Sequence, residues 1–191
     1  VSNHFRFGSS VRGTILPRRL DDHSDIDYMI VFAERDAQPQ TYLDRLRRFA
    51  DAYYSSSDRK QSHPSIVLEL NHIKFDLVPA TLGWMNSYQI PTLDGGWQTT
   101  DPVDFSRRLE EADRNHKYLL KPTIRIAKVW NASRGHVFDS FAFEKWIADK
   151  NFIFCSSLRD YVFHVFEQLN ALAEPTQWRR EEIQRVKDDL T

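Results

Sequence analysis

The stretch SDIDYMIVF (residues 24–32) decides the fold, because two carboxylates open an apolar strand. Its β-branched, aromatic and aliphatic residues predict a largely buried strand over 26–32. Side chains two residues apart in a strand share a face, so Asp25 and Asp27 point one way and Tyr28 points the other. Two such carboxylates suit a hard divalent cation, which prefers oxygen ligands. A solvated strand start is the simpler alternative.

A second apolar strand carries another acid. In IKFDLVP (residues 73–79) the alternation puts three apolar side chains on one face, and places Lys74 and Asp76 on the other. An unpaired carboxylate is costly to bury. Asp76 therefore needs either an ion pair with Arg or Lys, or a metal that it shares with the acids of 24–32.

Upstream, GSSVRGT (residues 8–14) contains a Gly-Ser turn. Free backbone N–H groups and a hydroxyl in such a turn can hold phosphate oxygens, although most Gly-Ser turns are only turns. Arg12 can contact phosphate or pair with Asp21 or Asp22.

The rest of the chain is rich in strands before about residue 80 and helical after Pro91. We expect a polar loop over 55–62 and a second strand that ends at Pro79. Apolar runs predict strands over 66–70 and 73–78. Amphipathic spacing predicts helices over 41–54, 102–112, 116–131, 140–149, 156–172 and 178–190. The pattern indicates an α+β fold with an N-terminal part over 1–95 that contains the strands and a helical part over 96–191.

The composition excludes several classes of protein. The chain has 191 residues, 41% of them hydrophobic, and a net charge of −1, so neither disorder nor an obligatory nucleic-acid partner is expected. One cysteine excludes a disulfide within the chain and a cysteine zinc cluster, and the histidines show no spacing typical of zinc ligands. No apolar run approaches the ~20 residues that span a bilayer. We expect a cytoplasmic protein, with further residues before Val1.

Together, these motifs resemble the nucleotidyltransferase superfamily that includes DNA polymerase beta, and within it the bacterial cGAS/DncV-like nucleotidyltransferases. The likeness covers about residues 5–150 in family order. It is carried by FGSSVRGT (7–14), SDIDYMIVF (24–32), KFDLVPA (74–80), GWQTTDPVDF (96–105), IRIAKVWN (124–131) and DSFAFEKW (139–146). The chain departs from the pattern in its long spacing between Ser9 and Asp25, in lacking the family's long N-terminal helix, and in lacking the zinc insert of the animal DNA sensor.

The resemblance implies that residues 1–95 form a polymerase beta-like catalytic core, a mixed sheet with flanking helices, and that residues 96–191 form a helical lobe that closes the nucleotide cleft. It implies two Mg²⁺ or Mn²⁺ ions on three catalytic carboxylates, Asp25, Asp27 and Asp76. It also implies four nucleotide-binding residues, Gly8, Ser9, Lys128 and Ser140. The residues alone allow simpler roles, an exposed helix cation for Lys128 and a helix N-cap for Ser140.

The function implied is Mg²⁺-dependent synthesis of cyclic di- or trinucleotide, or short oligonucleotide, second messengers from NTPs, in bacterial anti-phage signalling. No membrane and no obligatory nucleic acid are expected, and a regulatory protein partner is compatible with this function. The alternatives are a minimal nucleotidyltransferase that modifies a protein or RNA, and a catalytically silent nucleotide-binding module. Four aromatic residues are candidates for base stacking, although each is more often a core residue: Tyr28, Trp84, Trp97 and Phe141.

Overall fold

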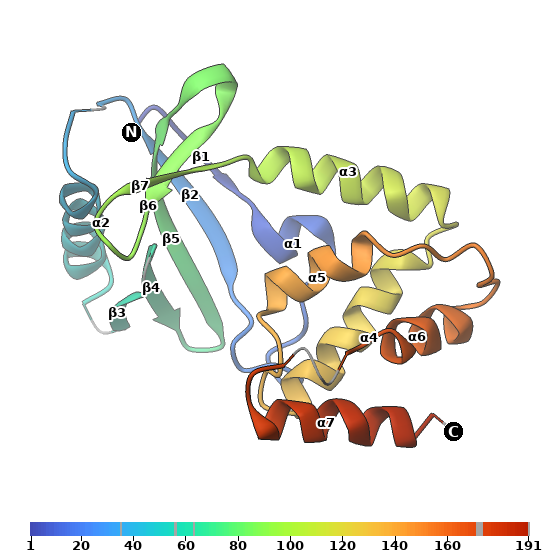
Figure 1. The fold of residues 1–191 in the computed structure, drawn as a ribbon. Coiled ribbons are helices and arrows are strands. Elements are labelled where there is room, and N and C mark those ends of the chain that lie inside the picture. The colour runs from blue at the N-terminus through green and yellow to red at the C-terminus, as the bar shows by residue number, and fades with distance from the viewer. Residues whose placement is uncertain (35, 56, 63, 171–173, 191) are drawn as a thin grey trace. The chain divides into compact units, whose positions relative to one another are not determined.

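The computed structural model describes residues 1–34, 36–55, 57–62, 64–170 and 174–190 (Figure 1). The strands are β1 (Asn3–Arg6), β2 (Ile26–Phe32), β3 (Asp58–Ser62), β4 (Ser65–Leu70), β5 (Ile73–Leu82), β6 (Tyr88–Pro91) and β7 (Trp97–Thr100). The helices are α1 (Gly8–Arg12), α2 (Pro39–Tyr53), the 3₁₀ turn η1 (Trp84–Asn86), α3 (Pro102–Asn115), α4 (Leu120–Ser133), α5 (Ser140–Ala148), α6 (Leu158–Glu167) and α7 (Gln177–Asp188). The predicted α+β class is confirmed.

The chain forms two compact units. The first contains Val1–Ile15 and Ser24–Arg108, and the second contains Leu16–His23 and Leu109–Thr191. These bounds describe which residues pack together. They do not test the predicted division into a catalytic core over 1–95 and a helical lobe over 96–191, which stays a prediction. The short segment Leu16–His23 packs with the helical unit although it lies between α1 and β2 in the sequence.

The first unit is built on a mixed sheet, in which seven strands of the described chain take part. Its main order is β1-β2-β5-β4-β3, with β6 paired to β5 and β7 paired to β6. Strands β2 and β5 are parallel, and the other pairs are antiparallel. The predicted strand over 26–32 is β2, and its alternation places its two sets of side chains on opposite faces of the sheet.

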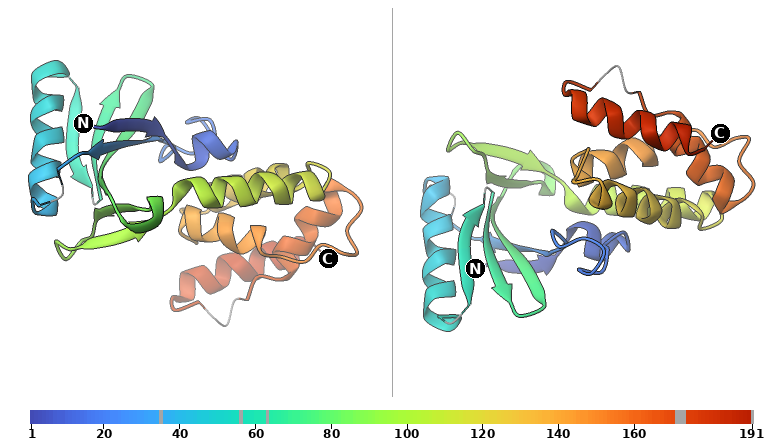
Figure 2. Two further views of the ribbon diagram at one scale, coloured as in Figure 1. Left: turned by 90° about the horizontal axis from the view of Figure 1, so that it is seen from above. Right: turned by 90° about the horizontal axis from the view of Figure 1, so that it is seen from below.

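Each face of this sheet has its own apolar cluster. Helix α2 lies along one face (Figure 2) and buries Tyr42, Leu43 and Leu46 against Phe32 and Leu77. The cluster on the opposite face is formed by Met29, Val31, Val78, Ala80 and Ile90. Side chains therefore alternate along β2 and β5: one set points toward α2, and the other set points away from it.

Three local expectations were wrong. The Gly-Ser stretch begins the short helix α1 rather than a plain turn, and part of the polar stretch 55–62 forms β3 against β4; Ser56 of that stretch lies outside the described residues. Strand β5 continues through Pro79 to Leu82, because β4 pairs only as far as Leu77 and β6 begins to pair at Thr81, so no ladder bond on that side needs an N–H from Pro79.

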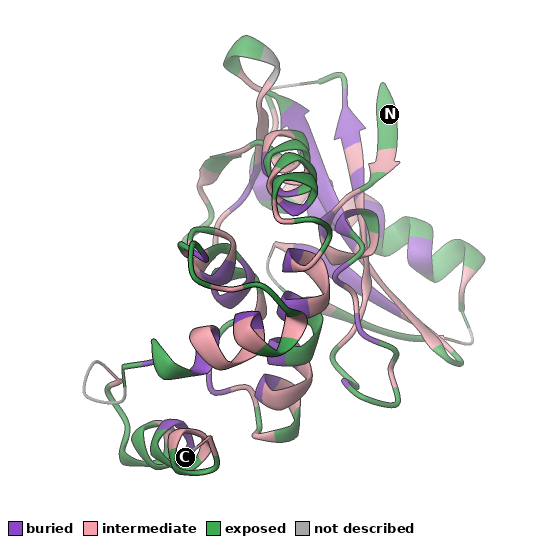
Figure 3. Cartoon of the chain, turned by 90° about the vertical axis from the view of Figure 1, so that its right-hand side faces the viewer, coloured by how far each residue is buried: buried purple, intermediate pink, exposed green. Residues whose placement is uncertain are grey.

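The second unit is held by an apolar core shared among its helices. Leu120, Ile124, Val165 and Ile183 are completely buried in it, and buried positions follow the inner sides of these helices (Figure 3). Helix α4 begins at Leu120, later than the predicted 116, because Lys117 and Tyr118 adopt a left-handed backbone that separates it from α3. Within the described residues, the structure contains no helix long and apolar enough to cross a membrane.

Candidate active site

The acids of the two apolar strands meet in register. Asp27 of β2 is the direct partner of Asp76 of β5 in the parallel ladder. Both are followed two residues later by members of the apolar cluster that faces away from α2, Met29 and Val78. Since side chains two apart share a face, the two carboxylates lie on that same face of the sheet.

Gly8 lies against one of these carboxylates. Strand β1 pairs with β2 as far as Arg6, and the backbone N–H of Phe7 donates to the carbonyl oxygen of Asp27 at 3.0 Å. A β-carbon built on Gly8 would lie 1.8 Å from Oδ2 of Asp27, and the φ angle of Gly8 is +71°. Only glycine satisfies both conditions, so the sequence places the start of α1 in direct contact with the acidic strand.

Asp76 is only partly satisfied by the protein. The Ser65 hydroxyl lies 3.0 Å from Oδ2 of Asp76 and 2.7 Å from the carbonyl oxygen of Ser62, so its single proton is shared between two acceptors. Oδ1 of Asp76 is buried and has no hydrogen-bond partner. A buried carboxylate oxygen without a donor is costly, and a cation at this position would supply the missing interaction.

Burial raises the pKa of Asp76 above its ordinary value, and the nearby charge of Asp25 raises this pKa further. The charges of Lys74 and Lys60 and the Ser65 hydroxyl act in the opposite direction and are outweighed. Carboxylates grouped to bind a divalent cation repel one another when they are surrounded only by protein atoms, and this repulsion raises their pKa.

Asp25 is held by a lysine. Nζ of Lys74 lies 3.2 Å from Oδ2 of Asp25, and both side chains are largely shielded from solvent. The ion pair that the sequence allowed for Asp76 is thus made by Asp25, with the lysine that lies two residues before Asp76 on the same face of β5. The hydrogen-bond partner Ser65 and the counter-charge Lys74 are site residues that the sequence reasoning did not select. Only the position of Lys74, two residues from Asp76, could have indicated one of them.

The remaining predicted residues fall in both units. Ser9 follows Gly8 in α1 of the first unit, and its carbonyl oxygen accepts hydrogen bonds from the backbone N–H groups of Thr14 and Ile15. Lys128 lies in α4 of the second unit and is 6% exposed, so it is not an exposed helix cation. Ser140 is the first residue of α5; its cap is Asp139, whose side chain accepts from the backbone N–H of Ala142 at 2.8 Å, so the N-cap alternative for Ser140 is wrong.

Two of the aromatic candidates lie on the face of the sheet away from the acids. Tyr28 and Trp97 pack against the apolar cluster that α2 covers. Trp84 is exposed in η1 and Phe141 is half exposed in α5. Arg12, for which phosphate, Asp21 and Asp22 were the expected partners, stacks its guanidinium over the ring of Phe105 at 5.2 Å.

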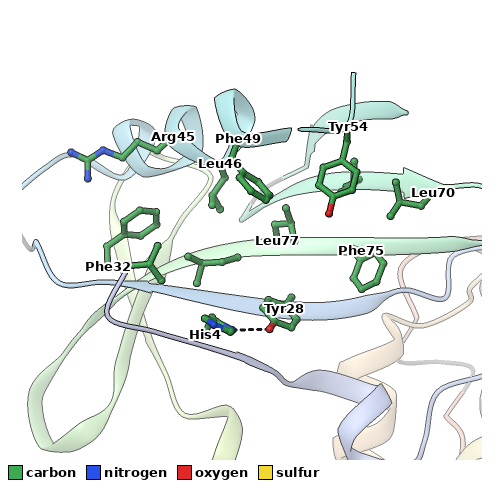
Figure 4. A pocket seen from close by; sticks show the side chains of 13 residues that line it. His4, Tyr28, Phe32, Arg45, Leu46, Phe49, Tyr54, Leu70, Phe75 and Leu77 are labelled. Atoms are coloured by element: carbon green, nitrogen blue, oxygen red, sulfur yellow. Dashed lines mark hydrogen bonds between the residues drawn. The ribbon is translucent and has the colours of Figure 1, made fainter. Parts of the chain in front are cut away.

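An apolar pocket of about 580 Å³ opens on the α2 side of the sheet. Figure 4 shows side chains of α2, β2 and β5 pointing into it, with Tyr28 hydrogen-bonded to His4 at 2.8 Å. This pocket is distinct from the acidic site, because Tyr28 and Asp27 are neighbours in β2 and point to opposite faces. Its lining is almost entirely apolar and does not suit a triphosphate.

The arrangement defines a class of protein: a mixed sheet that carries carboxylates on two paired strands, with a glycine at the start of a short helix packed against one of them. This is the polymerase beta-like nucleotidyltransferase fold. Paired carboxylates with a buried unpartnered oxygen can hold divalent cations, and these position phosphates for in-line transfer.

Residues 1–113 match the model of the SMODS family, the Second Messenger Oligonucleotide or Dinucleotide Synthetase domain. The chain therefore belongs to the SMODS family, and is a cGAS/DncV-like nucleotidyltransferase of the second-messenger type. No curated protein matches it.

Solved structures with the same fold are distant in sequence. CdnG, a CD-NTase from Bradyrhizobium diazoefficiens in complex with GTP, is 12% identical with a TM-score of 0.75, over 100% of this chain and 78% of that one. The Vibrio cholerae DncV cyclic AMP-GMP synthase is 11% identical with a TM-score of 0.77, over 98% of this chain and 63% of that one. CdnC from E. coli MS115-1, in complex with HORMA-deltaN, is 16% identical with a TM-score of 0.69, over 99% and 74%.

Proposed function

We propose that this chain joins NTPs into cyclic di- or trinucleotide, or short oligonucleotide, second messengers in a reaction that depends on Mg²⁺ or Mn²⁺. The observation that carries the proposal is the pairing of Asp27 with Asp76 on adjacent strands, with Gly8 packed against Asp27. The predicted division into a catalytic core over 1–95 and a helical lobe over 96–191 is part of this proposal.

Asp25, Asp27 and Asp76 hold two metal ions in this proposal. The residues fit such ions, because Oδ1 of Asp76 is buried without a donor and its pKa is raised by burial and by the charge of Asp25. When bound, two divalent ions supply positive charge to the triphosphate and to the attacking oxygen. Lys74 supplies part of this positive charge to Asp25 from within the protein.

The triphosphate is the proposed ligand of four further residues. Gly8 and Ser9 approach it with backbone N–H groups and a hydroxyl, which are neutral donors suited to phosphate oxygens. Lys128 adds a point charge and Ser140 a hydroxyl. Lys128 is buried in α4.

NTPs are the proposed substrates, in line with the GTP held by CdnG. The HORMA-bound state of CdnC supports a regulatory protein as a further partner of this chain. The proposed setting is anti-phage signalling in a bacterial cytoplasm, which suits a single cysteine that forms no disulfide.

The test is incubation of the purified protein with the four NTPs and Mg²⁺ or Mn²⁺, with pyrophosphate release and product masses as readouts. We expect a phosphatase-resistant nucleotide in the wild type and none in Asp25→Asn/Asp27→Asn. Asp94→Asn is the matched control, since Asp94 is exposed in the turn between β6 and β7. An undiminished double variant would contradict the metal assignment.

The same experiment separates the alternatives. Transfer of labelled nucleotide to a macromolecule without a small product would identify an enzyme that modifies protein or RNA. NTP binding without turnover, with either metal and with a candidate regulatory protein added, would identify a silent nucleotide-binding module. The presence of all three acids argues against that module.

A further inference from the structure

A second group of potential metal ligands lies in the helical unit and shares no residue with the three acids. Asp21, Asp22 and His23 come from the segment Leu16–His23, and His136 comes from the turn after α4. One side-chain ligand atom from each of the four lies within 4.8 Å of those of the others. All four residues belong to the same compact unit.

Two nitrogen and two oxygen ligands converge in this group. Nε2 of His136 lies 3.5 Å from Oδ1 of Asp21, and Nε2 of His23 lies 3.8 Å from Oδ1 of Asp22. The two imidazole rings are stacked, with centroids 4.3 Å apart and an angle of 13° between their planes. The two histidines thus present their Nε2 atoms to the same pair of adjacent carboxylates.

The backbone holds this geometry from both sides. Asn131, which is buried, donates to the carbonyl oxygen of Phe138 and accepts from its N–H, both at 2.9 Å, and its own carbonyl oxygen accepts from the N–H of His136 at 2.8 Å. Across from it, Oδ1 of Asp21 accepts from the N–H of His23 at 3.0 Å. The turn and the segment are therefore both pre-organised.

His136 adopts an uncommon backbone conformation. Its φ angle is +59°, directly after Gly135 at +73°. A non-glycine residue in the left-handed region carries strain that the surrounding structure must hold, and such residues gather at ligand sites. Asp21, opposite His136, is a carboxylate only 7% exposed. A buried charge and a strained histidine in contact indicate a site built for more than packing.

We propose that Asp21, Asp22, His23 and His136 bind one divalent transition-metal ion of the Zn²⁺ type. Imidazole nitrogen selects Zn²⁺, Co²⁺ and Ni²⁺ over Mg²⁺, and two carboxylates balance the charge of the ion. Four such ligands complete a tetrahedral site of the closed, structural kind. The bound ion links the segment Leu16–His23, which precedes Ser24 and Asp25, to the turn that follows α4.

The experiment uses the full chain after removal of metals with a chelator. Zn²⁺ is titrated by calorimetry, and Co²⁺ is titrated as an absorbing probe of tetrahedral coordination. We expect one equivalent of Zn²⁺ per chain, which millimolar Mg²⁺ does not displace, and the same equivalent in Asp25→Asn/Asp27→Asn. This last result separates the site from the acids of the proposed function, whose failure would leave Zn²⁺ binding unchanged.

The variants are chosen to keep the fold. His136→Asn preserves a residue that tolerates the left-handed backbone, and His23→Gln changes a side chain that is 68% exposed. Each is expected to weaken Zn²⁺ binding at least tenfold and to remove the Co²⁺ absorption. His164→Gln, a histidine on α6, is the matched control and keeps both.

Unfolding temperatures in chelator decide whether a variant is folded. If His136→Asn is unfolded, the comparison of His23→Gln with His164→Gln decides the test alone. The proposal is overturned if folded wild type binds no Zn²⁺, or if folded His23→Gln binds it as the wild type does. Either result would identify the four side chains as an ordinary ion-paired contact.

Discussion

Gly8 occupies the space beside the carboxylate of Asp27: a β-carbon on Gly8 would stand 1.8 Å from Oδ2 and 2.6 Å from Cγ of that residue. Non-bonded atoms do not approach so closely, so any side chain at position 8 displaces Asp27. The contact connects the start of α1 to the acidic strand, so the distance between the proposed phosphate-binding backbone and the proposed metal-binding carboxylate depends on the glycine at position 8.

Gly8→Ala is expected to lower pyrophosphate release at least ~100-fold, because displacing a positioning group by about 1 Å can cost that much. Gly13→Ala is a close control, since Gly13 has a φ of +73° but nothing within 4 Å of a built β-carbon. Both variants lose about 1–2 kcal/mol of stability from the left-handed backbone. Equal activity of the two variants, measured beside their unfolding temperatures, would show that the contact with Asp27 has no catalytic weight.

Asp76→Asn is expected to abolish activity and to stabilise the metal-free protein above acidic pH. The pKa of Asp76 is raised in the folded state, so the stability that its protonated form contributes is complete below about 4 and is lost as the pH rises through the folded pKa. The asparagine side chain at position 76 does not ionise, so the variant does not lose this stability as the pH rises. Its advantage over wild type in chelator should grow from pH 4 toward neutrality in thermal unfolding.

Asp94→Asn is expected to have the opposite effect, a loss of stability above acidic pH. The Thr92 hydroxyl and the Gly96 N–H hold the pKa of Asp94 below its usual value, so the carboxylate stabilises above about pH 4 and this contribution is lost as the pH falls through the folded pKa. Parallel pH profiles for the Asp76 and Asp94 variants would refute the role assigned to burial.

Lys74→Met is expected to destabilise the metal-free protein and to increase its stabilisation by added Mg²⁺. The variant keeps much of the apolar stem and removes the charge that faces Asp25 at 3.2 Å and opposes the raised pKa of Asp76. Thermal unfolding with and without Mg²⁺ measures both effects. Lys60→Met is the control, because Lys60 is exposed and is the smallest of the causes acting on Asp76; indistinguishable shifts in the two variants would exclude a specific role for Lys74.

Asp160→Ala is expected to destabilise the helical unit at neutral pH. Its carboxylate accepts from the N–H and hydroxyl of Ser156 and from the N–H of Ser157, each at 2.9 Å, in a capping box at the start of α6. These hydrogen bonds lower the pKa of Asp160 to about 2, so its stabilisation holds above pH ~4 and disappears as the pH falls through about 2. Melting curves of wild type and variant should converge over that range, and a constant gap would contradict the capping role.

Local periodicity was enough for much of the fold. The alternation in 24–32 and 73–79 predicted β2 and most of β5 and the faces of their acids, because side chains alternate with a period of two in any strand. Strand β3 and the hairpin β6–β7 were missed because their strands have only four or five residues, too few for a clear alternation, and β3 is also polar.

The site residues also divide into those that the sequence could indicate and those that required the structure. Asp76 could be singled out from the sequence because an unpaired acid inside an apolar strand is costly to bury. Asp25 and Asp27 were selected through their spacing of two residues and the family resemblance. Ser65 could not be assigned, since a serine at a strand start is common on any sheet, and Lys74 was indicated only by its position two residues from Asp76. Their roles depend on which oxygen each one reaches.

By itself, the sequence determined that this protein has an acidic strand, a third acid on a second strand and a Gly-Ser stretch before them, because each is encoded within a few consecutive residues. Only the tertiary structure decided that Asp27 pairs with Asp76, that Gly8 touches Asp27 and that His23 stacks on His136. The register of a parallel pair and the contact of two distant segments arise from long-range packing, and no local pattern of residues encodes that packing.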